Sequence, residues 1–262
     1  MPAAERPSLV TPVVCAVTVT AWLLLWGWDN SAYAHYEGHS GWLDAATVYH
    51  RCSGVAGAPL AVTVSFHLIA WMLMLTAMML ATTIPLLHVF RRMTSSRANR
   101  NQLMVLLVCG YFAAWSLFGV LAHAADAMLH GAADQVAWLT VHAWVPGAAI
   151  LATAGAWQLS SLKGRCLDRC RSPVMFITQH WHGAHERSAS FMLGFRHGLF
   201  CIGCCWALML LMFVVGTASI AWMLAIAAMM GAEKTLSWGR RISVPLGVGL
   251  LSWAALIVAE NL

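Results

Sequence analysis

The chain has 262 residues, of which 60% are hydrophobic and only 10% are charged. Soluble domains carry about 25% charged residues, so this composition excludes an ordinary soluble domain and predicts an integral membrane protein with a single membrane domain. The formal net charge of +5 does not indicate nucleic-acid binding, because Lys and Arg placement in a membrane protein reports its orientation.

The first apolar segment covers residues 10–28 and can cross a bilayer, which takes about 20 apolar residues. A stretch of small residues follows and ends at Ala34. Because such a stretch is typical of a signal-peptidase site, two outcomes are open: a retained helix, or cleavage after Ala34. The segment is long and carries three tryptophans, which suit a membrane interface, so we favour retention.

A polar loop at residues 29–59 contains side chains that bind metal ions. They are His35, His39, His50 and Cys52. The loop is either a weak metal-collecting surface or an ordinary solvated loop. We group residues 1–60 as the first transmembrane helix with this outer loop. Residues 61–262 then form a six-helix metal-binding membrane domain.

The second apolar segment, residues 61–90, has a methionine-rich pattern. His67, Met74 and Met78 share one helical face, while Met79 lies on another. Methionine is common core filler, so the pattern fits either packing or a path of metal ligands that begins at His67. Pro85 predicts a kink near the inner end of the helix.

The third segment, residues 101–125, ends near three polar side chains that would share a face if the helix continued. They are His123, Asp126 and His130. An aspartate can orient a ligating histidine or coordinate the metal itself. The alternative is a polar helix end that faces water.

The fourth segment covers residues 137–162, and a basic loop at residues 163–188 follows it. Basic loops are expected on the cytoplasmic side. Cys166 and Cys170 in this loop would be reduced thiols there, able to exchange a metal ion with a carrier. The alternative is an anchor loop with incidental cysteines, because one short Cys spacing is a weak signal.

The fifth segment, residues 191–215, carries the strongest chemical pattern. His197, Cys201 and Cys204 share a helical face at i, i+4 and i+7, with Cys205 beside them. Met212 continues this stripe, and Met209 lies at its edge. Soft sulfur ligands select Cu(I), zinc or iron–sulfur centres. Three cysteines within five positions are harder to explain as packing than one would be.

The remaining apolar segments, residues 220–232 and 242–259, complete an all-α, polytopic membrane helix bundle of about seven transmembrane helices. Glu233 and Lys234 between them either pair with each other or lie at the interface. The loops at 91–100, 163–189 and 233–241 hold nearly all the basic residues. This asymmetry predicts a cytoplasmic N-terminus and a periplasmic C-terminus in the bacterial inner membrane.

At residues 197–206 the chain resembles a family of predicted metal-binding integral membrane proteins of bacteria, long catalogued as a domain of unknown function. Further matching residues lie at 77–79, 162–173, 203–209 and 233–234. The Gly-Cys-Cys-Trp block at 203–206 is the specific part, and the resemblance covers roughly residue 61 to the C-terminus. It implies metal binding but no particular reaction or transport direction.

We expect Cu(I) handling, meaning binding, transport or delivery, with zinc as the alternative metal. The abundant methionine favours copper, because thioether sulfur is a soft ligand that suits Cu(I). One helix cannot surround an ion, so Met78 or Met79 is expected to complete the site. The expected partners are the lipid bilayer and a metal chaperone or metalloenzyme.

Three other functions remain open. The Cys201 and Cys204 spacing could support thiol–disulfide exchange, although the pair lies within a helix and lacks the helix N-terminus that activates such a thiol. The chain could also be a subunit or assembly factor of a membrane metal-dependent oxidoreductase. In the third case it is a structural scaffold whose cysteines are structural. Gly194 and Gly198 suit close helix contact in any of these cases.

Overall fold

The computed structural model describes residues 9–30, 60–136, 138, 142, 144–181, 185–215 and 219–261. Throughout this part of the chain the regular elements are helices, which confirms the all-α prediction. They are α1 (Val10–Asp29), α2 (Leu60–Met79), a 3₁₀ turn (Leu80–Thr83), α3 (Ile84–Met93), α4 (Arg100–Gln135), α6 (Trp144–Leu159), α7 (Ser161–Arg171), α8 (Pro173–His180), α9 (Glu186–Val215), α10 (Ile220–Thr235) and α11 (Gly239–Asn261).

Among the described residues, five stretches are helical, long and apolar enough to cross a membrane. They are Val10–Trp28, Leu68–Met93, Arg100–Leu129, Glu186–Met212 and Gly239–Asn261. The helices α6 and α10 have 16 residues each, about 24 Å at 1.5 Å per residue. A hydrocarbon core is about 30 Å thick, so seven complete spans are not shown.

The second predicted segment is broken near its end. Helix α2 gives way to the 3₁₀ turn Leu80–Thr83, and α3 starts with Pro85 in its first turn. Proline has no backbone N–H and cannot continue the hydrogen-bond ladder of the preceding helix. The break leaves Met79 at the last position of α2.

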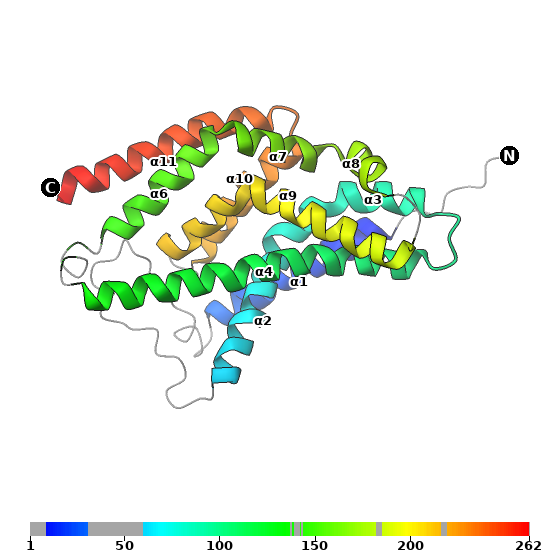
Figure 1. Cartoon of the computed structure of the whole chain (residues 1–262), viewed down its shortest axis with the longest axis horizontal. Coiled ribbons are helices and arrows are strands. Elements are labelled where there is room, and N and C mark those ends of the chain that lie inside the picture. The colour runs from blue at the N-terminus through cyan, green and yellow to red at the C-terminus, as the bar shows by residue number, and fades with distance from the viewer. Residues whose placement is uncertain are drawn as a thin grey trace.

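Helices α4 and α9 lie side by side and form the long central pair of the molecule (Figure 1). A Cβ atom added at Gly194 would lie 1.9 Å from the Leu107 carbonyl oxygen, so the two backbones are in direct contact. At Gly198 the added atom would meet the Cβ of Ala114 at 2.7 Å. This confirms that the two glycines serve close helix contact. Helices α6 and α11 form a second packed pair.

The stretch that we predicted as a basic loop is largely helical, and the loop prediction was wrong there. Helix α7 starts after Ser160, whose side chain accepts a hydrogen bond from the Lys163 backbone N–H at 3.1 Å. Such a cap satisfies one of the free N–H groups at a helix start. Pro173 then begins α8. Helix α7 packs against α9, which brings this polar stretch onto the helix that carries the cysteines.

Glu233 and Lys234 do not pair with each other, because adjacent residues on a helix point about 100° apart. Glu233 instead accepts a hydrogen bond from the Lys163 ammonium at 2.5 Å, and both side chains are only 2% exposed. The Ser243 hydroxyl donates to the same carboxylate oxygen at 2.8 Å. Together, Lys163, Glu233 and Ser243 join α7, α10 and α11.

Several predictions lie outside the described residues. They concern the loop at 31–59 with its histidines and Cys52, and cleavage after Ala34. His67 and His130 belong to α2 and α4, but their side chains are outside the described part. Helix α1 packs against α2 and α3, and the Thr11 hydroxyl lies 2.6 Å from His88 Nε2.

Candidate metal centre

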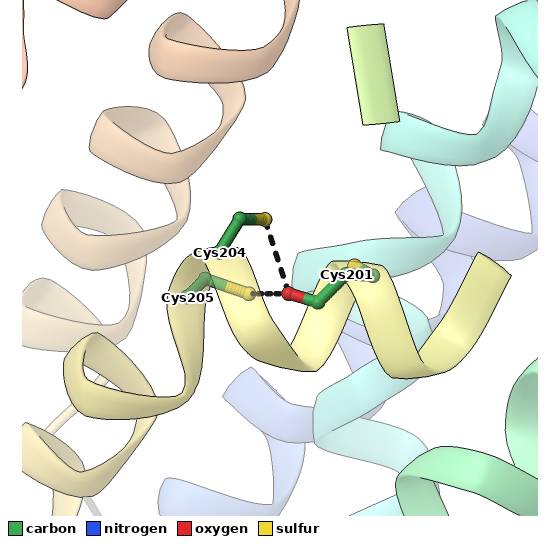
Figure 2. A group of neighbouring side chains, drawn as sticks. All are labelled: Cys201, Cys204 and Cys205. Carbon is green, nitrogen blue, oxygen red and sulfur yellow. Dashed lines mark hydrogen bonds between the residues drawn. The ribbon is translucent and has the colours of Figure 1, made fainter. Parts of the chain in front are cut away.

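Three thiols from one stretch of α9 form the centre of the candidate site. The sulfur atoms of Cys201, Cys204 and Cys205 lie within 4.8 Å of one another, and each residue is 1% exposed. All three are free cysteines. Figure 2 shows them on successive turns of the helix. Such a group offers soft donors at a spacing that one metal ion can bridge.

The thiols are hydrogen-bonded to their own helix. Cys204 Sγ donates to the Cys201 carbonyl oxygen at 3.0 Å, and Cys205 Sγ donates to the same oxygen at 2.9 Å (Figure 2). A thiol is a weak donor, so these bonds are a modest restraint. Metal binding must replace them, because a ligating cysteine loses its proton.

A fourth thiol comes from α7. Cys170 Sγ lies 4.0 Å from Cys204 Sγ. Hydrogen bonding to Cys201 and Cys204, together with burial, raises the pKa of the Cys170 thiol well above its ordinary value. The protonated thiol is therefore the favoured form of Cys170. A second helix thus supplies a ligand that the single helix α9 cannot.

Cys166, one turn earlier on α7, sets how closely the two helices approach. A Cβ atom added at Gly203 would lie 2.7 Å from Cys166 Sγ, so a larger residue at that position of α9 would require the Cys166 side chain or α7 to shift. The Trp157 indole N–H donates to the Gly203 carbonyl oxygen at 3.1 Å. Burial raises the pKa of the Cys166 thiol, with a further contribution from Cys204. Cys166 packs beside the cluster, whereas Cys170 reaches it.

The positively charged side chain of Lys234 lies against the thiols. Its ammonium nitrogen is 2.9 Å from Cys201 Sγ, 3.8 Å from Cys205 Sγ and 3.5 Å from Met79 Sδ. The Tyr111 hydroxyl is 3.2 Å from Cys201 Sγ. A positive charge next to a thiol stabilises the thiolate, which is the metal-binding form. Three sulfur atoms from α2 and α9 therefore already surround one positive charge.

A small cavity of about 40 Å³ adjoins the cluster. It is lined by residues of four α-helices and of the 3₁₀ turn, among them Cys170, His197, Cys201 and Lys234. This volume exceeds the roughly 10–15 Å³ that one water molecule needs. His197 is 4% exposed, and its Nδ1 atom has no hydrogen-bond partner among the described residues. A buried, unpartnered nitrogen beside thiols is consistent with a metal site, because such a group is costly without a partner.

Polar contacts join α7 to α10, two of the helices that pack against α9. The Arg171 guanidinium donates to the carbonyl oxygens of Glu233 and Leu236 at 2.6 Å each. These carbonyls belong to the end of α10, where helix acceptors lack partners within the helix. With the buried Lys163 and Glu233 pair, this clamp fixes Cys170 on α7 relative to Lys234 on α10.

The other predicted ligands fall into two groups. Met78, Met209 and Met212 are at most 3% exposed and belong to the same apolar cluster as the cysteines. His123 packs its ring against Trp71 at 5.5 Å between centroids. It is 12 positions beyond Tyr111 on α4, about 18 Å along the helix. His123 and Asp126 are thus distant from the cysteine cluster.

The sequence reasoning missed two polar neighbours of the thiols, Tyr111 and Lys234. Lys234 carried a signal, since a lysine at the end of an apolar segment needs a partner, but we considered only a pair with Glu233 or a position at the interface. Tyr111 carried none, because one tyrosine in an apolar helix is ordinary. Cys170 was identified as a ligand, but not as part of the same site as Cys204.

Residues 68–257 match the model of a protein family described as PpoB2, copper chaperone. The match starts after α1 and takes in the cysteine cluster, Cys170 and Lys234. No curated protein and no solved structure matches the chain.

Proposed function

The chain belongs to this copper chaperone family, and we propose that it is an integral membrane protein that binds Cu(I) in the cluster of Cys170, Cys201, Cys204 and Cys205 and passes it to an acceptor. The observation that carries the proposal is the meeting of thiols from two helices, with Cys170 Sγ 4.0 Å from Cys204 Sγ. A packed core has no need to bring four thiols together, whereas a soft ion does.

The donor set favours Cu(I) over zinc. Four thiolates alone would suit tetrahedral zinc. Here the Met79 thioether lies beside the same ammonium as Cys201 and Cys205, and thioethers are ligands for Cu(I). The family description points to the same metal. Zinc is therefore the alternative that the experiment must exclude.

Lys234 gives the site a means of release. The ammonium and Cu(I) both carry a single positive charge, and both are attracted by the same sulfur atoms. When the ion leaves, the ammonium can return to Cys201 and the thiolate is not left as an uncompensated buried charge. The adjoining cavity offers room for this exchange.

Membrane integration belongs to this proposal. Five stretches of the described chain are apolar and long enough to cross a bilayer. Basic residues at 91–100 lie where two of these stretches meet, and the sequence carries a second basic group at 163–171. We propose the bacterial inner membrane with these basic residues in the cytoplasm. The acceptor is then a metal chaperone or a metalloenzyme that presents soft ligands.

The test is Cu(I) binding by the full chain, purified in detergent under reducing conditions and titrated against a chromogenic Cu(I) chelator. The variant Cys201→Ser with Cys204→Ser should lose the tightest equivalent, with affinity lower by more than about a hundredfold, or about 2.8 kcal/mol. The matched control is Cys15→Ser with Cys109→Ser, which changes two exposed cysteines. Equal affinity in the parent and both variants, or stronger retention of zinc than of Cu(I), would contradict the proposal.

A further inference from the structure

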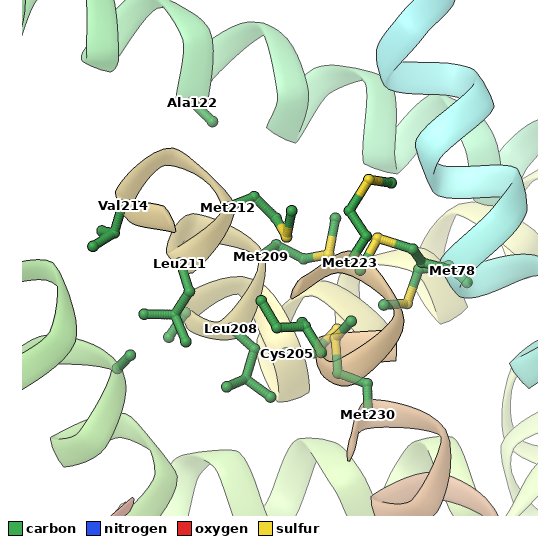
Figure 3. Packing of buried hydrophobic residues seen from close by; sticks show 14 of the residues in the cluster. Met78, Ala122, Cys205, Leu208, Met209, Leu211, Met212, Val214, Met223 and Met230 are labelled. Atoms are coloured by element: carbon green, nitrogen blue, oxygen red, sulfur yellow. The ribbon is translucent and has the colours of Figure 1, made fainter. Parts of the chain in front are cut away.

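Five buried methionines lie next to the cysteine cluster. We propose that they form a second Cu(I) site, built from thioethers alone, that receives the ion from the cysteines. The residues are Met78, Met209, Met212, Met223 and Met230, and we call them the thioether site. Each is at most 3% exposed. Figure 3 shows their side chains gathered between α2, α9 and α10, with Cys205 among them.

The position of the site follows from Lys234. Its ammonium fixes the end of α10 beside Cys201, Cys205 and Met79. Helix α9 ends at Val215 and α10 begins at Ile220, and so short a link spans at most about 18 Å. With one end of α10 near the close of α9 and the other at Cys201, the two helices must run antiparallel.

Sulfur atoms then recur one turn farther on each helix. On α9, Met209 follows Cys205 by four residues, which is about 6 Å along the axis. On α10, Met230 precedes Lys234 by four residues, and antiparallel packing carries it in the same direction. Met212 and Met223 lie farther along the same two helices. The sulfur-bearing residues therefore form a ladder along both helices, with steps of about one to two turns.

Cys205 joins the two sites. It belongs to the thiol group, with its sulfur within 4.8 Å of those of Cys201 and Cys204. It is also one of the residues that Figure 3 shows among the methionines. An ion bound by Cys205 can exchange its other thiols for thioethers without leaving sulfur coordination. No electron transfer is involved, and the ion stays Cu(I).

The chemistry of thioethers suits a transfer site. They are neutral, so they bind Cu(I) more weakly than thiolates do and displace no proton. They also discriminate against zinc, which prefers thiolate and imidazole. Leucine would fill the same volume with better-defined rotamers, so packing alone does not call for five methionines at one place. The ladder leads toward Trp71, two turns before Met78 on α2, whose ring packs against His123.

The experiment is a Cu(I) titration of the full chain in detergent, with stoichiometry read at weak and strong competition by the chelator. The parent should bind a tight and a weaker equivalent. The variant with Met209, Met223 and Met230 changed to Leu should keep the tight equivalent and lose the weaker one. Such swaps conserve volume and are among the best tolerated core substitutions.

The matched control changes three exposed methionines, Met128, Met175 and Met192, to Leu, and it should keep both equivalents. A second measurement needs no mutation: Cu(I) or Ag(I), but not zinc, should shift the methyl NMR signals of Met209, Met223 and Met230 in methyl-labelled parent protein. Unshifted signals, or a weaker equivalent that persists in the buried-methionine variant, would overturn the thioether site.

The physiological role of this site rests on the function proposed above, but the two can fail separately. Changing Cys201, Cys204 and Cys205 to Ser should remove the tight equivalent and leave the methyl shifts in place. If the parent binds a single equivalent that this variant removes, the thioether site is wrong and the proposed function stands. If the serine variant loses nothing while the buried-methionine variant does, the cysteine site is wrong and the thioether site stands.

Discussion

Cys170 of α7 and Cys204 of α9 lie 34 positions apart in the chain, yet their sulfur atoms are 4.0 Å apart. Neither is part of a disulfide. In the proposed site this pair adds a thiol from a second helix to the row of thiols on α9, so the proposal makes metal binding depend on the placement of α7.

We expect Cys170→Ser and Cys204→Ser to be coupled in Cu(I) affinity. If both ligate one ion, the double variant should lose less than the sum of the two single losses, with a coupling of about 0.5–3 kcal/mol. Chelator competition on the parent, the two single variants and the double variant gives the coupling free energy. Additive losses would mean that the two thiols serve different ions. Cys109→Ser, at an exposed position, is the single-cysteine control.

The approach of α7 to α9 can be tested at Gly203. Gly203→Ala should weaken Cu(I) binding, because the added methyl group would lie 2.7 Å from Cys166 Sγ and push α7 away. Adding Cys166→Ala removes that sulfur and should restore affinity, since the remaining Cβ is 3.4 Å away. Gly249→Ala on α11 meets nothing within 4 Å and should bind like the parent. Failure of Cys166→Ala to rescue would show that the contact is not limiting.

The buried pair of Lys163 and Glu233 should dominate the polar contribution to stability. Glu233→Gln leaves the Lys163 ammonium buried without its counter-charge, at a cost of about 3–5 kcal/mol. The exposed pair of Arg240 and Asp168, with 65% and 51% of the side chains exposed, provides the control. Arg240→Gln should change stability by less than about 1 kcal/mol. Thermal unfolding in detergent compares the two, and similar losses would contradict the burial argument.

Cu(I) affinity should increase with pH. The pKa of Cys170 is raised well above its ordinary value, so the thiol is protonated near neutrality and must release its proton to the solution on ligation. Each displaced proton contributes about a tenfold gain in affinity per pH unit below the thiol pKa. Cys170→Ser should reduce the slope by one proton. An unchanged slope would show that Cys170 does not ligate.

The proposed orientation predicts which surfaces face the cytoplasm. In a background with Cys15, Cys52 and Cys109 changed to Ser, a Ser95→Cys substitution at the exposed turn after α3 should react with a membrane-impermeant thiol reagent only after the cells are opened. Ala132→Cys, exposed near the other end of α4, should react in cells whose outer membrane alone is permeable. The reverse pattern would invert the topology.

Composition and local spacing determined the helical class of the protein. Apolar runs of about 20 residues can satisfy their backbone only as helices, and the i, i+3 and i+4 spacing placed Cys201, Cys204 and Cys205 together on α9. The kink near Pro85 and the close contact at Gly194 were also predictable. Both depend on covalent features of a single residue, a missing N–H and a missing Cβ.

Only the tertiary structure decided which distant groups meet those thiols. The basic residues of the stretch 163–188 led us to predict a loop. The sequence does not show which distant residues those charges contact. Lys163 is in fact buried against Glu233. The same packing of α7 and α10 on α9 has Cys170 beside Cys204 and Lys234 beside Cys201. Charge pairing and sulfur proximity depend on how helices far apart in the chain pack, whereas helical periodicity is a property of neighbouring residues alone.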